Sequence, residues 1–494
     1  MLSFSLFTVL VPALICFALI KSIHHILTEP LRKIAGPRLN RYTNVVLKLQ
    51  TMRGRRVHYI HELHSKYGPM VRIAPTEVAI SDVNSTREIH RIGSGYLKSE
   101  WYAKFTEESE DSLGIFSMIN AKQHAVRRRL FSAAFSQTAL LQWDEVLQYR
   151  TTLVIQKIKE QALSRGGADI FSWFTFMATD VTAELGFGES FHSLEHGKKS
   201  SFSEDLEKLM MFSGLKSELG FVATILSHLP IPAIQSWLGA LKRIESYGVA
   251  AIAKNKALAG RGETKDTLFT KMLRESDEKT GSLSDADIQR EASNLIVAGS
   301  DTTAVTLTYL VWAVLNNSEV KQKLVAEVSS IGNNPSSKDT NALPYLAAVI
   351  KETLRLYGAA PGSLPRSVPR GGRTLGSYFI PEGTTVSTQA YTLHRDPRIF
   401  PSPLQFKPER WLEPTQEMKD AWMPFGGGSR VCIGLHLAQS ELSLAAAKFF
   451  KECSTATVRT RDEDMELENY FLVAPKGHKC EIVLLPATGR ACLF

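Results

Sequence analysis

The chain has 494 residues, of which 44% are hydrophobic and 22% are charged. This is the composition of a folded globular protein, and it excludes a largely disordered chain. The formal net charge of +8 is mild and dispersed, which favours an anionic membrane surface or an acidic protein partner over nucleic acid. The five cysteines are irregularly spaced and include no C-x-x-C pair, which argues against a disulfide framework and a zinc site.

The first segment of the chain is an uncharged apolar run. Leu2 to Ile20, LSFSLFTVLVPALICFALI, is long enough to cross a bilayer as one helix, and the positive residues that follow it favour the cytoplasmic side. We therefore expect a transmembrane signal-anchor over residues 1–21, a basic Gly-Pro linker over 22–41 and a single cytosolic domain over 42–494. A cleaved signal peptide is the alternative, but no positive charge precedes the run and no A-x-A-like cleavage site follows it.

The body begins with a short helix and a hairpin. HYIHELHSKYG predicts a helix that ends at Gly68, and PMVRIAPTEVAIS alternates apolar and polar residues on either side of Pro75, as a hairpin does. Residues 120–357 are mostly helical in composition. Within them, Leu283 to Asn317 contains no proline, begins with Ser284 as a predicted N-cap, and is apolar nearly all round in its second half. Such a helix should cross the core of a large domain.

The composition changes after Tyr357, where proline and glycine become frequent and short β-like runs such as SYFI and TTVST occur. A helix returns after Cys432, and MELENYFLVAPKGHKCEIVLLPA predicts a terminal hairpin. No internal repeat or low-complexity linker divides the body. The sequence therefore predicts one domain that is mainly α with a smaller β part.

The stretch FGGGSRVCIG, Phe425 to Gly434, places a cysteine between a glycine-rich turn and the start of a helix. Successive N–H groups in such a turn form an anion-binding nest, and the helix N-terminus adds a positive dipole end. Both are expected to lower the pKa of the Cys432 thiol. Gly434 leaves room for a flat macrocycle, and Arg430 is placed to meet a carboxylate. In isolation, however, such a cysteine is more often a buried structural residue.

The pattern F-x-x-G-x-R-x-C-x-G, fulfilled by Phe425, Gly428, Arg430, Cys432 and Gly434, resembles the haem-binding loop of the cytochromes P-450. The resemblance spans roughly residues 36–487 and implies the cytochrome P-450 fold of the microsomal class, with haem b as cofactor. It also implies that Cys432 supplies the axial thiolate to the haem iron, and that the other four residues help to bind the haem. The PERW motif and the long FGGGSR loop resemble filamentous-fungal members.

The KETLR motif supplies Glu352 and Arg355, which share one helix face. This spacing on its own usually gives a surface ion pair. Arg410 in FKPERW resembles the third member of the family's buried Glu-Arg-Arg network. The resemblance therefore implies that these three residues support the cysteine loop.

The long helix carries the AGSDTT motif. The Thr302 hydroxyl can bond back to the Ala298 carbonyl, and we expect this bond, beside the missing side chain of Gly299, to open a local groove. Asp301 and Thr302 match the family's acid–alcohol pair. The resemblance implies that this pair is catalytic and relays protons for O–O cleavage.

Several residues are implied in binding the haem propionates. HAVRRRLF resembles the family's W-x-x-x-R helix, with His124 where tryptophan is common and with Arg128 on the arginine. Arg366 in LPRSVPR is another propionate partner. His394 in LHRDP is a further candidate, although it could equally be a satisfied structural histidine. Positions in the family also suggest a substrate pocket, although each residue is more often plain core: Phe116, Leu295, Ala298, Leu364 and Phe471.

The resemblance implies a haem-thiolate monooxygenase that inserts one atom of O2 into a small, mostly apolar organic substrate, in fungal secondary metabolism. The sequence contains no G-x-G-x-x-G pattern. Electrons are therefore expected from a separate NADPH-cytochrome P-450 reductase, with cytochrome b5 as an additional donor, at the endoplasmic reticulum membrane. Three alternatives remain: a haem-thiolate isomerase or dehydratase that does not use O2, a non-enzymatic haem binder, and a membrane-anchored protein without haem. Asp301 and Thr302 argue against the first.

Overall fold

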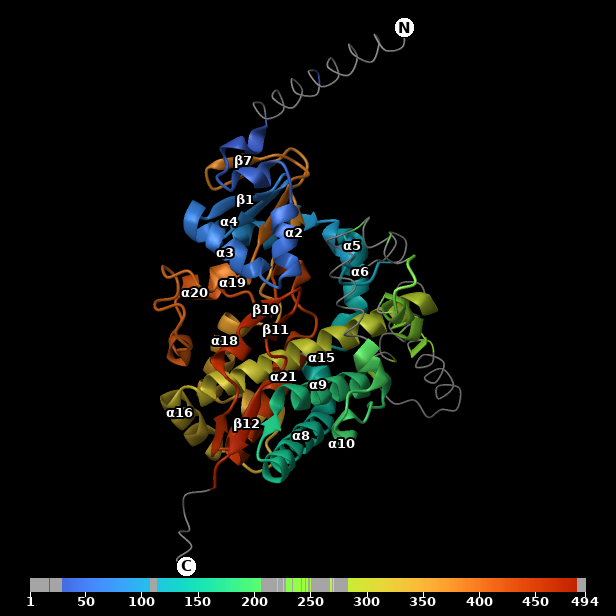
Figure 1. Cartoon of the computed structure of the whole chain (residues 1–494), viewed down its shortest axis with the longest axis vertical. Helices are drawn as coiled ribbons and strands as arrows, with labels where there is room; N and C mark the ends of the chain where they lie inside the picture. The colour runs from blue at the N-terminus through green and yellow to red at the C-terminus, as the bar shows by residue number, and fades with distance from the viewer. Residues whose placement is uncertain are drawn as a thin grey trace, which may run out of the picture.

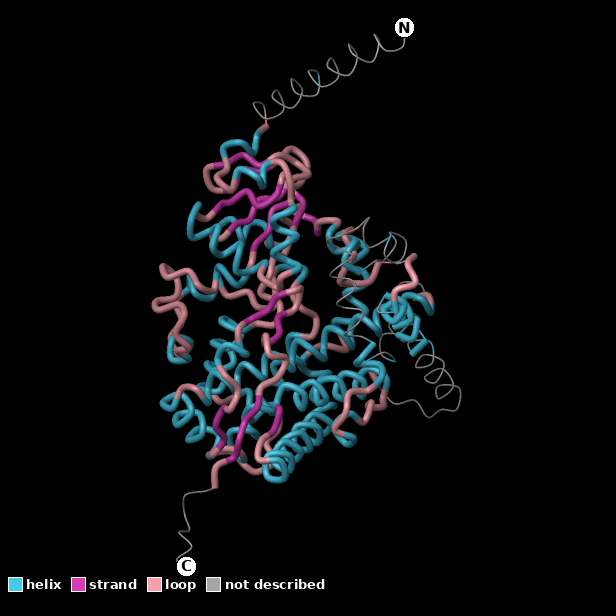
Figure 2. The backbone as a smooth tube through the Cα atoms, viewed as in Figure 1, coloured by secondary structure: helices cyan, strands magenta, loops and turns pink. Residues whose placement is uncertain are grey.

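The computed structural model describes residues 29–106, 113–205 and 283–486 without interruption, together with residue 17 and scattered positions between 220 and 270. Nearly all of the predicted signal-anchor, residues 1–21, lies outside the described residues. Within them the chain is mainly helical with a smaller β part, as predicted. Figure 2 shows that most strands gather at the N-terminal end, while helices dominate the rest.

The largest sheet in the described part of the chain has the strand order β1 (Met70–Ala74), β2 (Glu77–Ile80), β8 (Thr385–Thr388), β5 (Arg366–Ser367) and β3 (Leu97–Lys98). Strands β1 and β2 are antiparallel, which confirms the predicted hairpin. Strand β3 is antiparallel to β5 and sets Lys98 opposite Arg366. This pairing brings together two cationic residues that are far apart in the sequence.

Smaller sheets complete the β part. Strand β6 (Arg373–Leu375) pairs with β7 (Tyr378–Ile380), β10 (Leu467–Asn469) pairs with β11 (Val473–Pro475), and β12 (Glu481–Leu484) lies between β4 (Ala168–Asp169) and β9 (Ala456–Val458). The SYFI and TTVST runs form β7 and β8, as predicted. The terminal segment differs in one respect from the prediction. The hairpin β10–β11 forms, but β12 pairs with β4 and β9 and does not join it.

The helices before residue 200 are α2 (Val45–Met52), α3 (Arg56–Tyr67), α4 (Val83–His90), α5 (Trp101–Thr106), α6 (Ala121–Ser132), α7 (Gln137–Leu140), α8 (Asp144–Arg165), α9 (Ile170–Phe187) and α10 (Ser193–His196). The later helices are α15 (Asp285–Leu315), α16 (Ser318–Ser329), α17 (Ser337–Asn341), α18 (Pro344–Tyr357), α19 (Ala390–Leu393), α20 (Gln416–Ala421) and α21 (Leu435–Glu452). Short 3-10 turns are η1 (Pro30–Lys33), η2 (Arg38–Arg41), η4 (Leu141–Trp143), η5 (Pro408–Trp411), η6 (Gly428–Arg430) and η7 (Asp462–Met465). Helix α3 ends before Gly68, and α21 follows Cys432, as predicted.

Helix α15 crosses the helical part of the molecule, where α9 and α21 pack against it and α8 packs on α9 and α21 (Figure 1). It begins as predicted, because the Ser284 hydroxyl accepts from the Asp287 N–H at 3.1 Å and the Asp287 carboxylate accepts from the Ser284 N–H at 3.2 Å. Among the described residues, its stretch Ala286–Leu315 is the one helix long and apolar enough to cross a membrane. Its burial between α9 and α21 identifies it as a core helix.

Gly299 allows α15 and α9 to approach closely. A Cβ atom on this glycine would lie 2.5 Å from Oγ1 and 3.0 Å from Cγ2 of Thr182 on α9. The missing side chain was expected to open a groove for oxygen chemistry. In the structure, Gly299 lines the large cavity described below, as that expectation requires, and the Thr182 side chain occupies the direction of the missing side chain, so the glycine also serves helix packing.

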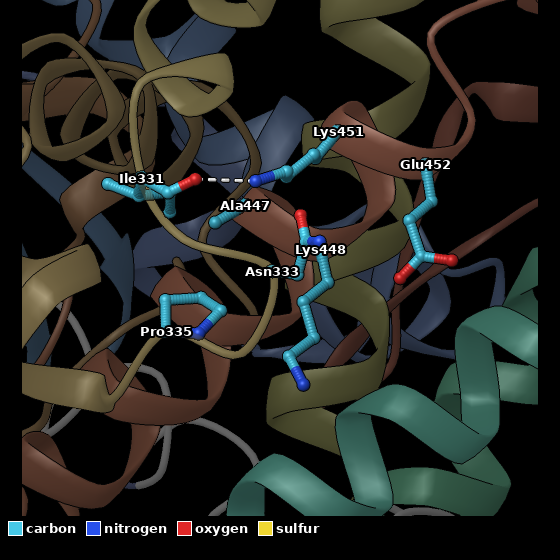
Figure 3. Close-up of a pocket in the computed structure, with 7 residues that line it drawn as sticks. All are labelled: Ile331, Asn333, Pro335, Ala447, Lys448, Lys451 and Glu452. Carbon is cyan, nitrogen blue, oxygen red and sulfur yellow. Dashed lines mark hydrogen bonds between the residues drawn. The ribbon is translucent and has the colours of Figure 1, made fainter.

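A small cavity of about 190 Å³ lies at the C-terminal end of α21, far along the helix from Cys432 (Figure 3). Lys451 donates from Nζ to the carbonyls of Ile331 and Gly332, which follow α16. Lys448 donates to the Gln148 carbonyl on α8. Both lysines therefore brace the end of α21 against its neighbours and take no part in the site described below.

We expect Gly299→Ala to destabilise the protein, although alanine is a better helix former than glycine by about 1 kcal/mol. The added methyl group overlaps Thr182, and such overpacking costs about 1–3 kcal/mol. In a Thr182→Ala background the overlap disappears, so the same Gly299→Ala change should become stabilising. Urea unfolding of the four proteins in this cycle measures both effects. A destabilisation of equal size in both backgrounds would contradict the packing role.

Candidate haem and oxygen site

A cavity of about 1660 Å³ lies between α15, the cysteine loop and the N-terminal sheet. The predicted site residues that line it come from several separate segments of the chain: Phe116, His124, Arg128, Leu295, Ala298, Thr302, Leu364, Arg366, Phe425, Arg430, Cys432, Gly434 and Phe471. Asp301 and Gly428 are not among the lining residues. The structure therefore brings nearly all of the predicted cofactor, oxygen and substrate residues around one space.

The cysteine loop closes on itself before α21 begins. The Cys432 N–H donates to the Phe425 carbonyl at 2.9 Å, and Gly434 is the N-cap of α21. The Cys432 side chain is exposed to the cavity. A Cβ atom on Gly434 would meet only the Cys432 Sγ atom, at 4.0 Å, so the space beside the sulfur is open.

Gly428 has a backbone role in this loop. Its φ is +60°, and a Cβ atom there would lie 1.8 Å from the carbonyl oxygen of His90, the last residue of α4. No other residue fits that approach without moving the backbone. Gly428 therefore seats the loop against α4 and does not face the cavity.

The pKa of the Cys432 thiol differs from the prediction. Burial raises this pKa above its ordinary value, while a hydrogen bond from the Gly434 N–H and the charge of Arg128 lower it. The predicted stabilising contributions are therefore present, but burial outweighs them. The expectation of a lowered pKa was wrong because it left out the cost of placing a thiolate deep in the protein.

Three guanidinium groups meet at one side of the cavity. Arg128 donates from Nη1 to the Val431 carbonyl at 2.7 Å, and Arg430 donates to the Met118 carbonyl at 2.7 Å. Arg366, which is buried, donates to the Tyr102 hydroxyl at 3.2 Å. Within the described ranges, no carboxylate forms an ion pair with any of these three arginines. Their positive charge is therefore not neutralised by the described protein itself.

The charge and burial of this cluster shift the pKa values of its members. Burial lowers the pKa of Arg430 to about 10, with further contributions from Arg366 and Arg128. Burial, followed by the charges of Arg430 and Lys98, lowers the pKa of His124 to about 3. His124 is therefore neutral at pH 7 and has one ring N–H to donate.

Lys98 is a member of this cluster that sequence reasoning missed. Its side chain is buried, and its ammonium group donates to the Phe116 carbonyl. Burial, then the charges of Arg366 and Arg430, lowers the pKa of Lys98 well below its usual range. No local pattern marks this lysine. Its place depends on the pairing of β3 with β5, which a single sequence does not show.

Glu352 is fully buried and lies at the centre of a hydrogen-bonded network. Its carboxylate accepts two bonds from Arg355 at 2.8 Å and one from Arg410 Nε at 3.1 Å. Trp411 Nε1 also donates to it, at 2.8 Å. Arg355 also donates to backbone carbonyls, including that of His394. The three residues predicted from KETLR and PERW therefore meet, and a tryptophan joins them.

His394 is a structural histidine. Its Nδ1 lies 3.0 Å from the Arg355 carbonyl, and its Nε2 accepts from the Met423 N–H at 3.0 Å. Burial lowers its pKa to about 3, so the ring is neutral at pH 7. It does not line the cavity, and of the two interpretations of LHRDP, the structure places it as a link between α18 and the cysteine loop.

Thr302 faces the cavity from α15. Its hydroxyl donates to the Ala298 carbonyl at 2.6 Å, as predicted from the motif. The hydroxyl oxygen keeps lone pairs that can accept a second hydrogen bond from the cavity side. Asp301 precedes it on the helix but does not line the cavity.

Comparison with known proteins decides the family. The family model described as Cytochrome P450 matches residues 36–482. The chain belongs to the cytochrome P450 family. This P450 is 42% identical to cytochrome P450 monooxygenase tazI of Aspergillus terreus over 478 residues, which is 96% of this chain and 97% of that protein.

Two other fungal relatives are similar over most of their length. Cytochrome P450 monooxygenase orf2 of Aspergillus niger is 38% identical and covers 96% of this chain and 97% of its own. Cytochrome P450 monooxygenase stcB of Emericella nidulans is 36% identical and covers 92% of this chain and 89% of its own. This P450 is therefore a monooxygenase that uses haem with a cysteine thiolate ligand, O2 and NADPH-derived electrons.

The residues around the cavity fit a haem. The open space beside the Cys432 sulfur, where Gly434 has no side chain, accommodates a flat ring system. The arginine cluster with no carboxylate partner in the described chain suits two propionate groups. The site thus offers one thiol and several cations to a planar dianion.

Glu441, on α21, is a second residue that sequence reasoning missed. It is fully buried, lines the cavity and has a hydrogen bond with the Thr303 hydroxyl on α15. Its Oε2 atom has no hydrogen-bond partner among the described residues. Burial raises the pKa of Glu441 to about 8, so the side chain is mostly protonated at pH 7. The local sequence HLAQSEL does not indicate that its glutamate is buried and protonated.

The pKa of Glu441 is raised in the folded protein. Between the ordinary pKa of a glutamate and this raised pKa, the folded state therefore keeps a proton that the unfolded state has released. Stability from this group should therefore fall as the pH rises from about 5 to about 8, by at most about 1.4 kcal/mol per pH unit. We expect Glu441→Gln to remove this slope. Urea unfolding across that range measures it.

Glu452→Gln, at the exposed end of the same helix, is the control for this measurement. Its carboxylate pairs with Lys159 at the surface, so the change should leave the slope as in the wild type. Equal pH slopes in the wild type and in Glu441→Gln would show that Glu441 is ionised when folded.

Proposed function

We propose that this P450 inserts one atom of O2 into a small, mostly apolar organic substrate, by hydroxylation, epoxidation or a related oxidation, with Cys432 as the thiolate ligand of the haem iron. The observation that carries the proposal is the Cys432 thiol, exposed to a large cavity beside the open space at Gly434. When bound, haem supplies the iron at which O2 is reduced.

The cation cluster supports a role for four predicted residues in holding the haem propionates. Arg128, Arg366 and Arg430 are each held by a hydrogen bond to the protein and line the cavity. His124 is neutral and can donate one hydrogen bond. The buried charges repel one another, so an anion bound among them is strongly favoured.

The proton relay is assigned to the AGSDTT motif. The Thr302 hydroxyl donates to the Ala298 carbonyl, and its oxygen can accept a hydrogen bond from a proton donor in the cavity. The hydroxyl can then pass a proton on from its own oxygen. Asp301 would supply protons from outside the cavity lining. Both roles rest on the motif and on the position of Thr302.

The setting of the enzyme follows from the sequence and its relatives. The apolar run Leu2 to Ile20 supports a single membrane anchor at the endoplasmic reticulum, with the catalytic domain in the cytosol. An NADPH-cytochrome P-450 reductase, with cytochrome b5 as an additional donor, would supply electrons to a net positive protein. The likeness to fungal monooxygenases supports a place in secondary metabolism.

We expect the reduced protein to give a red-shifted Soret band with CO, and Cys432→Ser to lose that band, because a hydroxyl does not replace the thiolate. Cys453→Ser is the control, since Cys453 is buried at the far end of α21. The CO-difference spectrum is the measurement. The same thiolate band in Cys432→Ser would overturn the ligand assignment.

We expect Thr302→Ala to retain haem but to divert electrons to peroxide, because the cavity loses the hydroxyl that passes protons. The ratio of hydrogen peroxide formed to NADPH oxidised, with reductase and O2, should rise several-fold. Thr308→Ala removes a similar back-bonded hydroxyl on α15 outside the cavity, and should not change the ratio. An unchanged ratio in Thr302→Ala would overturn the assignment of the relay to this residue.

A further inference from the structure

One wall of the large cavity is built from aromatic side chains of three separate segments. Trp101, Tyr102 and Phe105 come from α5, Phe116 precedes α6, and Phe471 lies between β10 and β11. We call these five residues the aromatic wall. All of them line the cavity, whereas α15 contributes no aromatic side chain to the lining among its described residues.

The rings of the aromatic wall contact one another in a continuous cluster. Phe105 stacks on Trp101, with centroids 5.1 Å apart, and lies 4.6 Å from Phe471. Phe116 meets Phe471 edge-on at 5.8 Å and Tyr102 at 5.4 Å. Each ring is thus placed by its neighbours.

The five rings of the wall differ in how much of their surface is exposed. Tyr102 and Phe105 are buried, with 2% and 5% of their surface exposed. Trp101, Phe116 and Phe471 are only half-buried and line the cavity. Most of the exposed ring surface therefore lies on three residues, while the other two line the cavity but are largely covered by their neighbours.

Two basic side chains hold this wall in place. The Lys98 Nζ atom lies 4.3 Å from the Tyr102 ring centroid and 4.7 Å from that of Phe116, and it donates to the Phe116 carbonyl. Arg430 holds the carbonyls of Met118 and Ile119, just after Phe116. The wall is therefore ordered before a substrate arrives, which lowers the entropy cost of binding.

We propose that the aromatic wall selects a planar, fused-ring aromatic substrate. Aromatic pairs gain about 0.5–1.5 kcal/mol beyond their buried area, and a saturated ring system of the same size does not gain this energy. The proposal rests on the proposed function, because it takes this cavity as the substrate site. It narrows the proposed substrate class from mostly apolar molecules to those with flat rings.

The test compares 2-naphthol with 2-decalol, which share a ten-carbon fused skeleton and one hydroxyl. Equilibrium dialysis of the haem-loaded full chain measures the dissociation constant of each. With one or two ring contacts, we expect 2-naphthol to bind roughly 2- to 100-fold more tightly. Equal binding, or tighter binding of 2-decalol, would overturn the proposal without any variant.

The double variant Trp101→Leu/Phe471→Leu keeps apolar side chains but removes two rings that face the cavity. We expect the preference for 2-naphthol to fall towards unity, with haem content and the CO-difference spectrum unchanged; Phe116 remains and can keep a part of it. Phe379→Leu is the matched control, since Phe379 lies exposed on β7 and should not alter the preference. A preference of undiminished size in the double variant would place the selectivity elsewhere and overturn the role of the wall.

The two proposals fail in different ways. If the proposed haem-thiolate function is wrong, the CO band is missing in the wild type. Loss of the substrate proposal appears in the dialysis ratio, which counts bound ligand directly and does not depend on turnover.

Discussion

The site depends on the hydrogen bonds that the fully buried carboxylate of Glu352 accepts. A charge removed from water must keep its partners, and here four hydrogen bonds from Arg355, Arg410 and Trp411 surround it. Since Arg355 lies on α18 and the other two lie in η5, the charge fixes the segment that leads to the cysteine loop. The loop is therefore anchored by an electrostatic requirement as well as by packing.

The same anchor reaches the sulfur through two routes. One passes from Arg355 to His394 and from His394 Nε2 to the Met423 N–H, two residues before Phe425. The other is a row of rings, since Trp411 contacts Trp422 and Trp422 contacts Phe425. Phe425 then accepts the Cys432 N–H. The thiol is thus held at a fixed place relative to α18, where a flat cofactor needs a rigid support.

Much of this arrangement could be predicted because it depends on short motifs and on the spacing of apolar residues. The span of α15 and the hairpin β1–β2 follow from local spacing, whereas the meeting of Glu352 with its arginines was implied by the resemblance of KETLR and PERW to the family's motifs. Lys98 and Glu441 could not be found in this way, because their surroundings are made by strand pairing and helix packing between distant segments. The direction of the Cys432 pKa was missed for a related reason, since desolvation depends on the whole fold and a motif shows only the local donors.

The cofactor site and the aromatic wall share their supports, which determines how variants must be interpreted. Arg366 lines the cation cluster and also bonds the Tyr102 hydroxyl, while Lys98 lies among those cations and holds the Phe116 carbonyl. A change at either residue therefore alters the electrostatics of the propionate site and the position of the rings at once. Leucine at positions 101 and 471 avoids this ambiguity, because neither side chain belongs to the cation cluster. Only substitutions of that kind separate what binds the haem from what selects the substrate.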